Sequence, residues 1–513
     1  MNIRLIFLSL FLFASASTIA AAQQPSHNTG PAEAAQPARD DNTFADVPAA
    51  VTHHQATVAG KELKYTATAG RLVIKSEESL TDAAIFFTAY TLDGEDAHTR
   101  PVTFVFNGGP GTATAWLHMG ALGPRKIRLE RDGGVPPPPY SIVDNPDTIL
   151  DRTDLVFIDA PGTGFSRVKP EAAKKLYNVM GDADAFYRFI RLYLTRYHRW
   201  GSPLFLFGES YGTTRAAALV NYLTDHYIPV NGVALLSVAL DFQTLQSGNL
   251  NDLPYQLIVP TYATIAAYHK RLAPDLAANL DATIKKIEQW CATDYAQALS
   301  QGSAIAPEAR KQIIAQLAAY TGLKPELIDE NDLRIEPQVF MHNLLKDQRL
   351  EVGRVDGRFT ALMPQGNARE PFFDPAMAAM FPAFNAAMNN YAEAELGFKS
   401  ETPHVIWDLE GINRKWDWGS GMDGYPQTAT QLQSAMAKNK YLKVLVMEGI
   451  YDIATPFYAT AYTFQHLRLT PDYRKNLSFA DFKGGHMVYN DAAALKEMKH
   501  TLDQWYEQAL GTK

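Results

Sequence analysis

The sequence predicts an α/β fold in which a mostly parallel sheet is interrupted by a long helical insertion. Alternating patterns at 51–106 indicate antiparallel strands, and strand-like and helical patterns then alternate to about residue 240, as in βαβ units. Helical periodicity dominates much of the following stretch, and a strand-like run returns at 443–447. A Gly-x-Ser-x-Gly pentapeptide at 208–212 joins an apolar run to a helical pattern, which is typical of one kind of strand-to-helix turn.

This pentapeptide predicts a nucleophile elbow. It follows the apolar run 204–207 and precedes helix formers at 213–223. In an elbow, a serine sits on a strained turn, and glycines two residues before and after it let the backbone fold back tightly. Ser210 is therefore the predicted nucleophile. The predicted fold class is the α/β-hydrolase fold with a largely helical lid insertion.

A serine hydroxyl also needs a base and a group that orients the base. His486 follows two glycines, so a loop can present its imidazole. In this fold class the acid lies between the serine and the histidine along the chain. Asp452 fits that order, because it ends the run 443–452, in which a strand-like pattern gives way to a Gly-containing loop. Glu448 is a rival acid that the sequence alone does not exclude.

An oxyanion hole requires two backbone N–H groups, one from the residue after the nucleophile and one from an earlier glycine-rich loop. Tyr211 supplies the first. The loop Asn107-Gly108-Gly109-Pro110-Gly111 follows the strand-like run 102–106 and offers the second.

Four blocks of the chain resemble, in order, the serine carboxypeptidase family, which includes yeast and plant vacuolar enzymes. They are residues 106–111, 154–166, 208–212 and 485–488. The resemblance covers about 60–240 and about 400 onward, and the chain looks like a bacterial secreted member that removes C-terminal residues from peptides. It implies a triad of Ser210, Asp452 and His486, oxyanion donors at Gly109 and Tyr211, and recognition of the substrate's free carboxylate by Asn107, Gly108 and Glu209.

The chemistry expected of Glu209 can also be argued from its position. An ionised carboxyl beside the nucleophile repels a substrate carboxylate, whereas burial or a nearby anion raises its pKa and makes it a hydrogen-bond donor. The alternative is an acid at a helix start that the helix dipole holds ionised.

Three positions depart from the family pattern. Ala121 stands where most members have a second glutamate, which puts the strength of carboxylate binding and an acidic pH optimum in doubt. Thr112 replaces a cysteine, and Cys291 is the only cysteine in the chain, so no intramolecular disulfide is possible. Tyr489 stands where a proline often follows the family's His-Met-Val.

Composition excludes several function classes. The net charge is −8 and no basic block is present, so nucleic-acid binding is not expected. We find no phosphate-binding loop, no paired Cys-x-x-Cys and no His-Glu-x-x-His helix. The sequence therefore predicts no cofactor and no metal site.

The first 22 residues read as a secretory signal peptide. A short positive start, an apolar core at 5–13 and small residues at 20–22 are its three parts. Residues 23–50 are rich in Pro, Ala, Gln and Asp and predict a flexible linker. No later segment is apolar over the length that spans a membrane. We therefore expect a secreted or periplasmic bacterial protein without a membrane anchor.

The rest of the chain divides into two core halves and an insertion. We expect the first half of the core at 51–240, a helical cap or lid at 241–400 and the second half at 401–513. Cys291 lies on an apolar helical stripe and is expected to be buried. Trp407, Trp416 and Trp418 could line a pocket or pack in the core.

The same motifs leave other functions open. An esterase or an aminopeptidase of the prolyl-iminopeptidase kind shares the elbow and the glycine loop, although Asn107 and Glu209 argue against the aminopeptidase. A non-catalytic binding protein on a hydrolase fold is a third possibility, which the intact Ser210, Asp452 and His486 disfavour. The expected partner is a peptide with a free C-terminus, and the sequence leaves the oligomeric state open.

Overall fold

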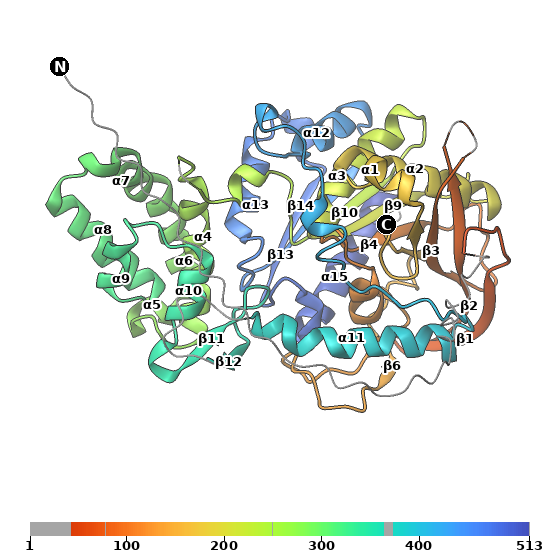
Figure 1. Ribbon diagram of the computed structural model, residues 1–513, viewed down its shortest axis with the longest axis horizontal. Coiled ribbons are helices and arrows are strands. Elements are labelled where there is room, and N and C mark those ends of the chain that lie inside the picture. The colour runs from red at the N-terminus through yellow and green to blue at the C-terminus, as the bar shows by residue number, and fades with distance from the viewer. Residues whose placement is uncertain (1–42, 77, 79, 249, 364–372, 512–513) are drawn as a thin grey trace, which may run out of the picture. The chain divides into compact units, whose positions relative to one another are not determined.

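A mixed sheet forms the centre of the described chain. The computed structural model describes residues 43–511 except 77, 79, 249 and 364–372. Within these residues, ten strands pair in the order β1-β2-β3-β7-β4-β9-β10-β13-β14, with β8 beside β3 (Figure 1). The bounds along this order are β1 (Ala50–Val58), β2 (Lys61–Lys75), β3 (Thr81–Leu92), β7 (Asp154–Ile158), β4 (Val102–Phe106), β9 (Leu204–Glu209), β10 (Gly232–Leu236), β13 (Lys443–Gly449), β14 (Leu477–Phe482) and β8 (Arg167–Val168).

The sheet has a parallel part and an antiparallel part, and the strand direction alternates from β1 through β3 to β7. The strands from β7 to β14 in this order run parallel, whereas β1, β2 and β3 are antiparallel. Two short pairs lie outside the sheet, β5 (Arg125–Ile127) with β6 (Ile142–Asp144) and β11 (Leu350–Val352) with β12 (Thr360–Leu362).

Side chains of the central strands alternate between two hydrophobic cores, one on each face. In β9, Phe205 and Phe207 belong to one core, and Leu204 and Leu206 belong to the other, as the two-residue period of a strand requires. Burial on both faces explains why these strands read as continuous apolar runs.

Helices cover both faces of the sheet. Helices α2 (Val179–Arg196), α3 (Tyr211–Asp225) and α12 (Ala429–Lys438) pack in the core that contains Leu206. Helices α11 (Pro375–Ala394) and α15 (Ala492–Leu510) pack in the core that contains Phe207. This arrangement is the predicted α/β-hydrolase fold. The remaining helices of this part are α1 (Ala173–Leu176), α13 (Phe457–His466) and α14 (Pro471–Arg474).

A third core belongs to the helices between β10 and α11, which we call the insertion helices. It includes the stacked pair Tyr262 and Phe340 and the buried free thiol of Cys291, as the sequence predicted. The insertion helices are α4 (Leu253–Tyr268), α5 (Pro274–Ala278), α6 (Leu280–Trp290), α7 (Ala296–Gln301), α8 (Pro307–Thr321), α9 (Pro325–Glu330) and α10 (Pro337–Asn343).

The range 241–400 is not uniform in its packing. The insertion helices share their own core, whereas Phe384 and Tyr391 of α11 pack with the sheet. A cap with the bounds 241–400 stays a prediction.

The N-terminal segments fall mostly outside the described residues. The predicted signal peptide at 1–22 and the predicted linker up to residue 42 are among the parts that the structure does not describe, and β1 begins at Ala50. In the described ranges, no helix combines the length and the apolar character needed to cross a membrane.

A buried ion pair joins α3 to α2 and to the glycine loop. The Nε atom of Arg215 donates to Asp182 Oδ2 over 2.8 Å, and both side chains are fully buried. Another guanidinium nitrogen donates to the carbonyl oxygen of Asn107 over 2.6 Å. The glycine loop is thereby fixed to two helices.

We expect Asp182→Ala to lower the free energy of unfolding by about 3 kcal/mol or more, because it leaves the Arg215 charge buried without a carboxylate. Urea unfolding followed by circular dichroism measures this change. The matched control is Asp472→Ala, which breaks an ion pair with Lys475 whose side chains are 88% and 69% exposed and should cost less than about 1 kcal/mol. Equal decreases in the free energy of unfolding of the two variants would contradict the structural role of the buried pair.

Candidate active site

Ser210 occupies a strained turn between β9 and α3. Its φ of 60° lies in the region that side chains other than glycine rarely adopt. A Cβ atom on Gly208 would lie 2.2 Å from the carbonyl oxygen of Gly212, and one on Gly212 would lie 2.8 Å from that of Phe106. Both glycines are therefore steric requirements of this turn, and the serine lies at the first turn of α3.

The side chains of Asp452 and His486 meet beside this turn. They follow β13 and β14, so they share the carboxyl edge of the parallel strands with Ser210. The Nδ1 atom of His486 lies 2.6 Å from Asp452 Oδ2, and Asp452 is fully buried. Asp452 also accepts hydrogen bonds from the backbone of Ala454 and from the Thr455 hydroxyl, at 2.7 and 2.6 Å.

Two opposing influences set the pKa of His486. Burial lowers it, but the charge and the hydrogen bond of Asp452 raise it, and the result is a pKa above the ordinary value. The Asp452 carboxylate therefore stabilises an imidazolium at this position.

The rival acid Glu448 points elsewhere. Its Oε1 atom accepts a hydrogen bond from the backbone of Val238 over 3.0 Å. Burial raises its pKa well above the ordinary value. Asp452 is thus the acid in contact with His486, and Glu448 instead binds the backbone of Val238 within the sheet.

The glycine loop lies directly against the start of α3. A Cβ atom on Gly108 would lie 2.4 Å from the backbone nitrogen of Tyr211, and Gly109 has a φ of 104°. The amide of Tyr211 belongs to the first residue of α3, where no carbonyl within the helix can accept its hydrogen. Gly109 and Tyr211 line the same pocket as Ser210.

Asn107 and Glu209 form a buried pair beside the serine. The Nδ2 atom of Asn107 donates to Glu209 Oε1 over 2.9 Å, and Asn107 Oδ1 accepts from the backbone of Leu117 over 3.0 Å. Burial raises the pKa of Glu209 to about 7, although the His486 charge acts to lower it. No described residue makes a hydrogen bond to the buried Glu209 Oε2.

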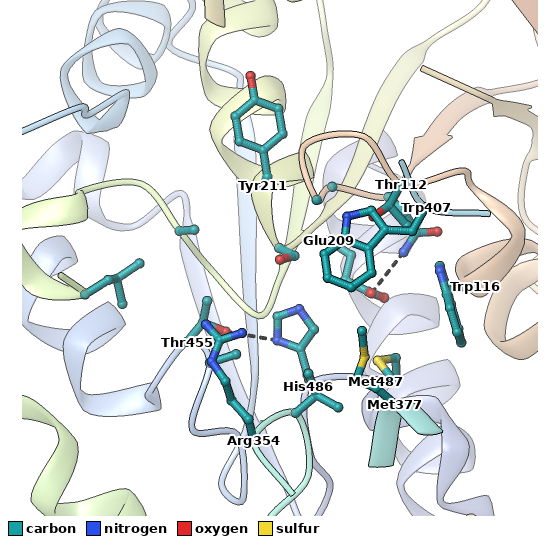
Figure 2. Close-up of a pocket in the computed structure, with 18 of the residues that line it drawn as sticks. Thr112, Trp116, Glu209, Tyr211, Arg354, Met377, Trp407, Thr455, His486 and Met487 are labelled. Atoms are coloured by element: carbon teal, nitrogen blue, oxygen red, sulfur yellow. Dashed lines mark hydrogen bonds between the residues drawn. The ribbon is translucent and has the colours of Figure 1, made fainter. Parts of the chain in front are cut away.

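A cavity of about 280 Å³ is lined by the predicted site residues except Asp452, which reaches the site through its contact with His486. Figure 2 shows Glu209, Trp407 and Trp116 on one side of the His486 ring and Arg354 on the other. The cavity is lined by Ser210, His486, Asn107, Gly108, Gly109, Glu209 and Tyr211, together with Thr112, Trp116, Ala239, Phe242, Leu245, Gln246, Arg354, Val355, Met377, Phe381, Trp407, Trp418, Ala454, Thr455 and Met487.

The three tryptophans considered in the sequence divide between the two interpretations. Trp407 and Trp418 line the cavity. Trp416 is buried against Tyr211 and Ile412, with its ring centroid 5.2 Å from that of Tyr211. Trp416 therefore packs against Tyr211, and Trp407 and Trp418 form part of the cavity wall.

The positions that depart from the family pattern also have definite places. Ala121 is fully buried in the core that contains Phe207. Thr112 lines the cavity. Tyr489 is buried, and its ring covers Gly120 so closely that a Cβ atom there would lie 2.6 Å from it.

One part of the site has no counterpart in the sequence analysis. The segment 353–358, which we call the brace, lies inside the insertion range but contacts both the acid loop and the histidine loop. Ile453 N donates to Arg354 O over 3.0 Å, and His486 N donates to Val355 O over 2.6 Å. The available signal was a Gly-Arg-Val-Asp-Gly stretch within the range that the sequence predicted to be a helical lid.

The geometry indicates acyl-transfer chemistry. A serine on an elbow and a histidine held by a buried aspartate are parts that this chemistry requires, and Gly109 and Tyr211 line the same cavity. In the described ranges, no cluster of three or more His, Cys, Asp or Glu side chains is arranged to hold a metal ion.

A comparison with protein families matches residues 62–481 to the family described as serine carboxypeptidase. The chain belongs to the serine carboxypeptidase family. It is thus a member of a family of hydrolases, as the four sequence blocks predicted. A comparison with curated proteins gave no match.

Solved structures with similar folds include a prohormone-processing carboxypeptidase from Saccharomyces cerevisiae. It is 16% identical, with 86% of this chain and 91% of that chain covered and a TM-score of 0.49. A proline iminopeptidase from Mycobacterium smegmatis is 13% identical, covering 86% and 99% with a TM-score of 0.39. A thermostable carboxyl esterase from Bacillus coagulans is 12% identical, with the same coverage and a TM-score of 0.36. The family assignment rests on the sequence match.

Replacing Gly485 by alanine should displace the histidine loop. An added Cβ atom would lie 2.4 Å from the Cβ atom of Asp356 and 2.5 Å from the carbonyl oxygen of Val355. We expect peptidase kcat/KM to fall about 100-fold, since a shift of the order of 1 Å in a reacting group has an effect of this size.

The matched control for this variant is Gly421→Ala, because a Cβ atom at Gly421 meets nothing within 4 Å. It should retain the wild-type activity. A Gly485→Ala enzyme with wild-type activity would mean that the brace does not position His486.

Proposed function

We propose that the protein is a serine carboxypeptidase that releases C-terminal residues from peptides through an acyl-enzyme on Ser210. The observation that carries this proposal is one cavity that combines Ser210 and the His486–Asp452 hydrogen bond with the buried Asn107–Glu209 pair. The first group supplies the chemistry, and the second supplies recognition of the peptide end.

In the acylation step, Ser210 Oγ attacks the carbonyl carbon of the last peptide bond. His486 takes the serine proton on Nε2 and then gives it to the nitrogen of the departing C-terminal residue. A water molecule attacks the resulting ester, with His486 again taking and returning a proton, so that Ser210 is restored.

Asp452 orients the histidine throughout this cycle. Because Nδ1 of His486 faces Asp452 Oδ2 at 2.6 Å, the neutral ring carries its proton on Nδ1 and leaves Nε2 free to accept one. The Thr455 hydroxyl and the backbone of Ala454 hold the carboxylate in place.

The negative charge of each tetrahedral intermediate needs fixed donors. We assign this role to the amides of Gly109 and Tyr211, because both line the cavity and the Tyr211 amide lies at the positive end of α3. The Tyr211 ring, held by Trp416, keeps this part of the helix in place.

The substrate's terminal carboxylate is assigned to Asn107, the backbone of Gly108 and Glu209. With a pKa raised to about 7, Glu209 is protonated in mildly acidic solution and can donate from Oε2, which has no partner among the described residues. Asn107 Nδ2 uses one hydrogen for Glu209 and has a second one for the substrate.

Export is a second element of the proposal. The signal-peptide pattern at 1–22 supports a secreted or periplasmic enzyme. Its natural partners are then peptides with a free C-terminus in that compartment.

Ser210→Ala should abolish peptide turnover while leaving the far-ultraviolet circular dichroism unchanged, because the nucleophile is lost and the fold is not. Release of free amino acids from an N-blocked dipeptide measures this. Reaction of Ser210 with a fluorophosphonate, detected by mass spectrometry, provides the matching test in the wild-type enzyme. A fully active alanine variant contradicts the proposed nucleophile, and failure to label Ser210 favours a non-catalytic binding protein.

Three forms of one peptide separate the enzyme classes. The first has free termini, the second has an amidated C-terminus, and the third has a blocked N-terminus. We expect amidation to abolish cleavage and N-blocking to have little effect, because the cavity offers hydrogen-bond donors for a carboxylate at Asn107 and Glu209. The measurement is kcat/KM for each peptide. Loss on N-blocking instead points to an aminopeptidase, and cleavage restricted to simple esters points to an esterase.

KM for a free-carboxylate substrate should rise as the pH increases from about 6 to about 8. The protonated Glu209 donates to the carboxylate, whereas the ionised form repels it, and its pKa is raised to about 7. Above that pKa the rise approaches roughly tenfold per pH unit. His486, Asp452 and Tyr489 are the titratable groups that act on Glu209.

The matched variant for this pH profile is Glu209→Gln, which keeps a hydrogen-bond donor and cannot ionise. Its KM should stay nearly constant over the same range. KM rather than kcat is the informative quantity, because His486 must also lose its proton before kcat reaches its full value. A variant profile identical to that of the wild type would remove Glu209 from carboxylate recognition.

A further inference from the structure

Arg354 is a cation within the cavity that the proposed catalytic cycle does not use. Among the described residues that line the cavity, it is the only Lys or Arg, and Glu209 is the only Asp or Glu. Its side chain is exposed. Figure 2 shows its guanidinium on the side of the His486 ring opposite to Glu209.

The backbone of Arg354 is fixed, and no described residue pairs with its charge. Arg354 N donates to Asp374 Oδ2 over 3.1 Å, and Arg354 O accepts from Ile453 N over 3.0 Å. No hydrogen bond or ion pair to its guanidinium is found in the part of the chain that the structure describes. A fixed backbone with a free cationic head is suited to binding a mobile anion.

The catalytic cycle itself gives no reason for this charge. A cation near His486 disfavours the imidazolium, and Arg354 is one of the influences that lower the pKa of His486 against the rise caused by Asp452. The Arg354 charge therefore destabilises protonated His486. If Arg354 contributes to activity, it does so by binding the substrate.

The direction of a bound peptide decides which substrate residue reaches Arg354. With the terminal carboxylate at Asn107 and Glu209 and the last peptide bond at Ser210, the C-terminal residue lies on the Glu209 side. That side is lined by Trp116, Met377, Trp407 and Met487. The penultimate residue supplies the acyl group and lies beyond Ser210, on the side of Arg354.

We propose that Arg354 selects peptides whose penultimate residue is acidic, Asp or Glu. This inference rests on the proposed carboxypeptidase function and adds a substrate class to it. An acidic side chain at this position pairs with the guanidinium, whereas a basic one is repelled. The apolar wall on the other side suits an apolar C-terminal residue, so the preferred ending is an acidic residue followed by an apolar one.

The test compares N-blocked dipeptides that differ only in the penultimate residue. Glu, Gln and Lys occupy that position, and Leu is the C-terminal residue throughout. For the wild-type enzyme, we expect kcat/KM for Glu to exceed that for Gln by roughly fivefold, the size of a partly exposed ion pair, and Lys to be the poorest. Raising the salt concentration should reduce the ratio.

Substitutions at Arg354 test the assignment directly. In Arg354→Gln the Glu-to-Gln ratio should fall to about one, in Arg354→Glu the order of Glu and Lys should reverse, and Arg354→Lys should keep a preference for Glu. The matched control is Arg128→Gln, an exposed cation that does not line the cavity, and it should keep the wild-type ratio. A ratio of rates is insensitive to partial loss of folded enzyme.

Three outcomes would overturn the inference. One is a wild-type enzyme with no preference for Glu over Gln, and another is an Arg354→Gln variant that keeps the wild-type preference. The third is an Arg354→Gln variant that cleaves amidated and free peptides equally well, which would mean that Arg354 binds the terminal carboxylate instead. Failure of the proposed function is distinct from all three outcomes. It appears as peptide turnover by the Ser210→Ala variant, or as cleavage of the amidated peptide by the wild-type enzyme.

Discussion

The site depends on contacts between backbones that are too close for any side chain. A Cβ atom on Gly108 would lie 2.4 Å from the nitrogen of Tyr211, and one on Gly449 would lie 2.0 Å from the carbonyl oxygen of Gly485. The first contact joins the glycine loop to the elbow, and the second joins the acid loop to the histidine loop. Carbon atoms cannot approach other atoms this closely, so these glycines set the separation within each of the two pairs of loops.

The insertion range contributes to the same framework. Its brace accepts hydrogen bonds from the backbones of Ile453 and His486, so the acid and the base share a support that belongs to neither half of the core. The brace also carries Arg354 into the cavity. The insertion range therefore supports the loops that carry Asp452 and His486 and also supplies part of the cavity wall, from Phe242 to Phe381.

The sequence was sufficient to predict those parts of the fold and the site that require particular residue types. Ser210 and His486 are each flanked by glycines that their turns require, and the alternating apolar runs predict the buried sheet. The choice between Asp452 and Glu448 could not be made from the sequence, because both belong to the run 443–452 and the pattern does not show that Glu448 lies within β13 whereas Asp452 lies in the loop that reaches the histidine. Val355 was missed because it acts through its carbonyl oxygen, and every residue type has one. Helix α11 was grouped with the insertion, since periodicity does not say against which core a helix packs.

The core of the insertion helices contains Tyr451 and Ile453, the two neighbours of Asp452 in the chain. Packing of that core therefore holds the loop that carries the acid. If the insertion helices melt at a lower temperature than the sheet, Asp452 loses its position while the elbow and its serine remain folded. Heat inactivation would then follow the melting of the insertion, and an enzyme with an intact sheet could still be inactive.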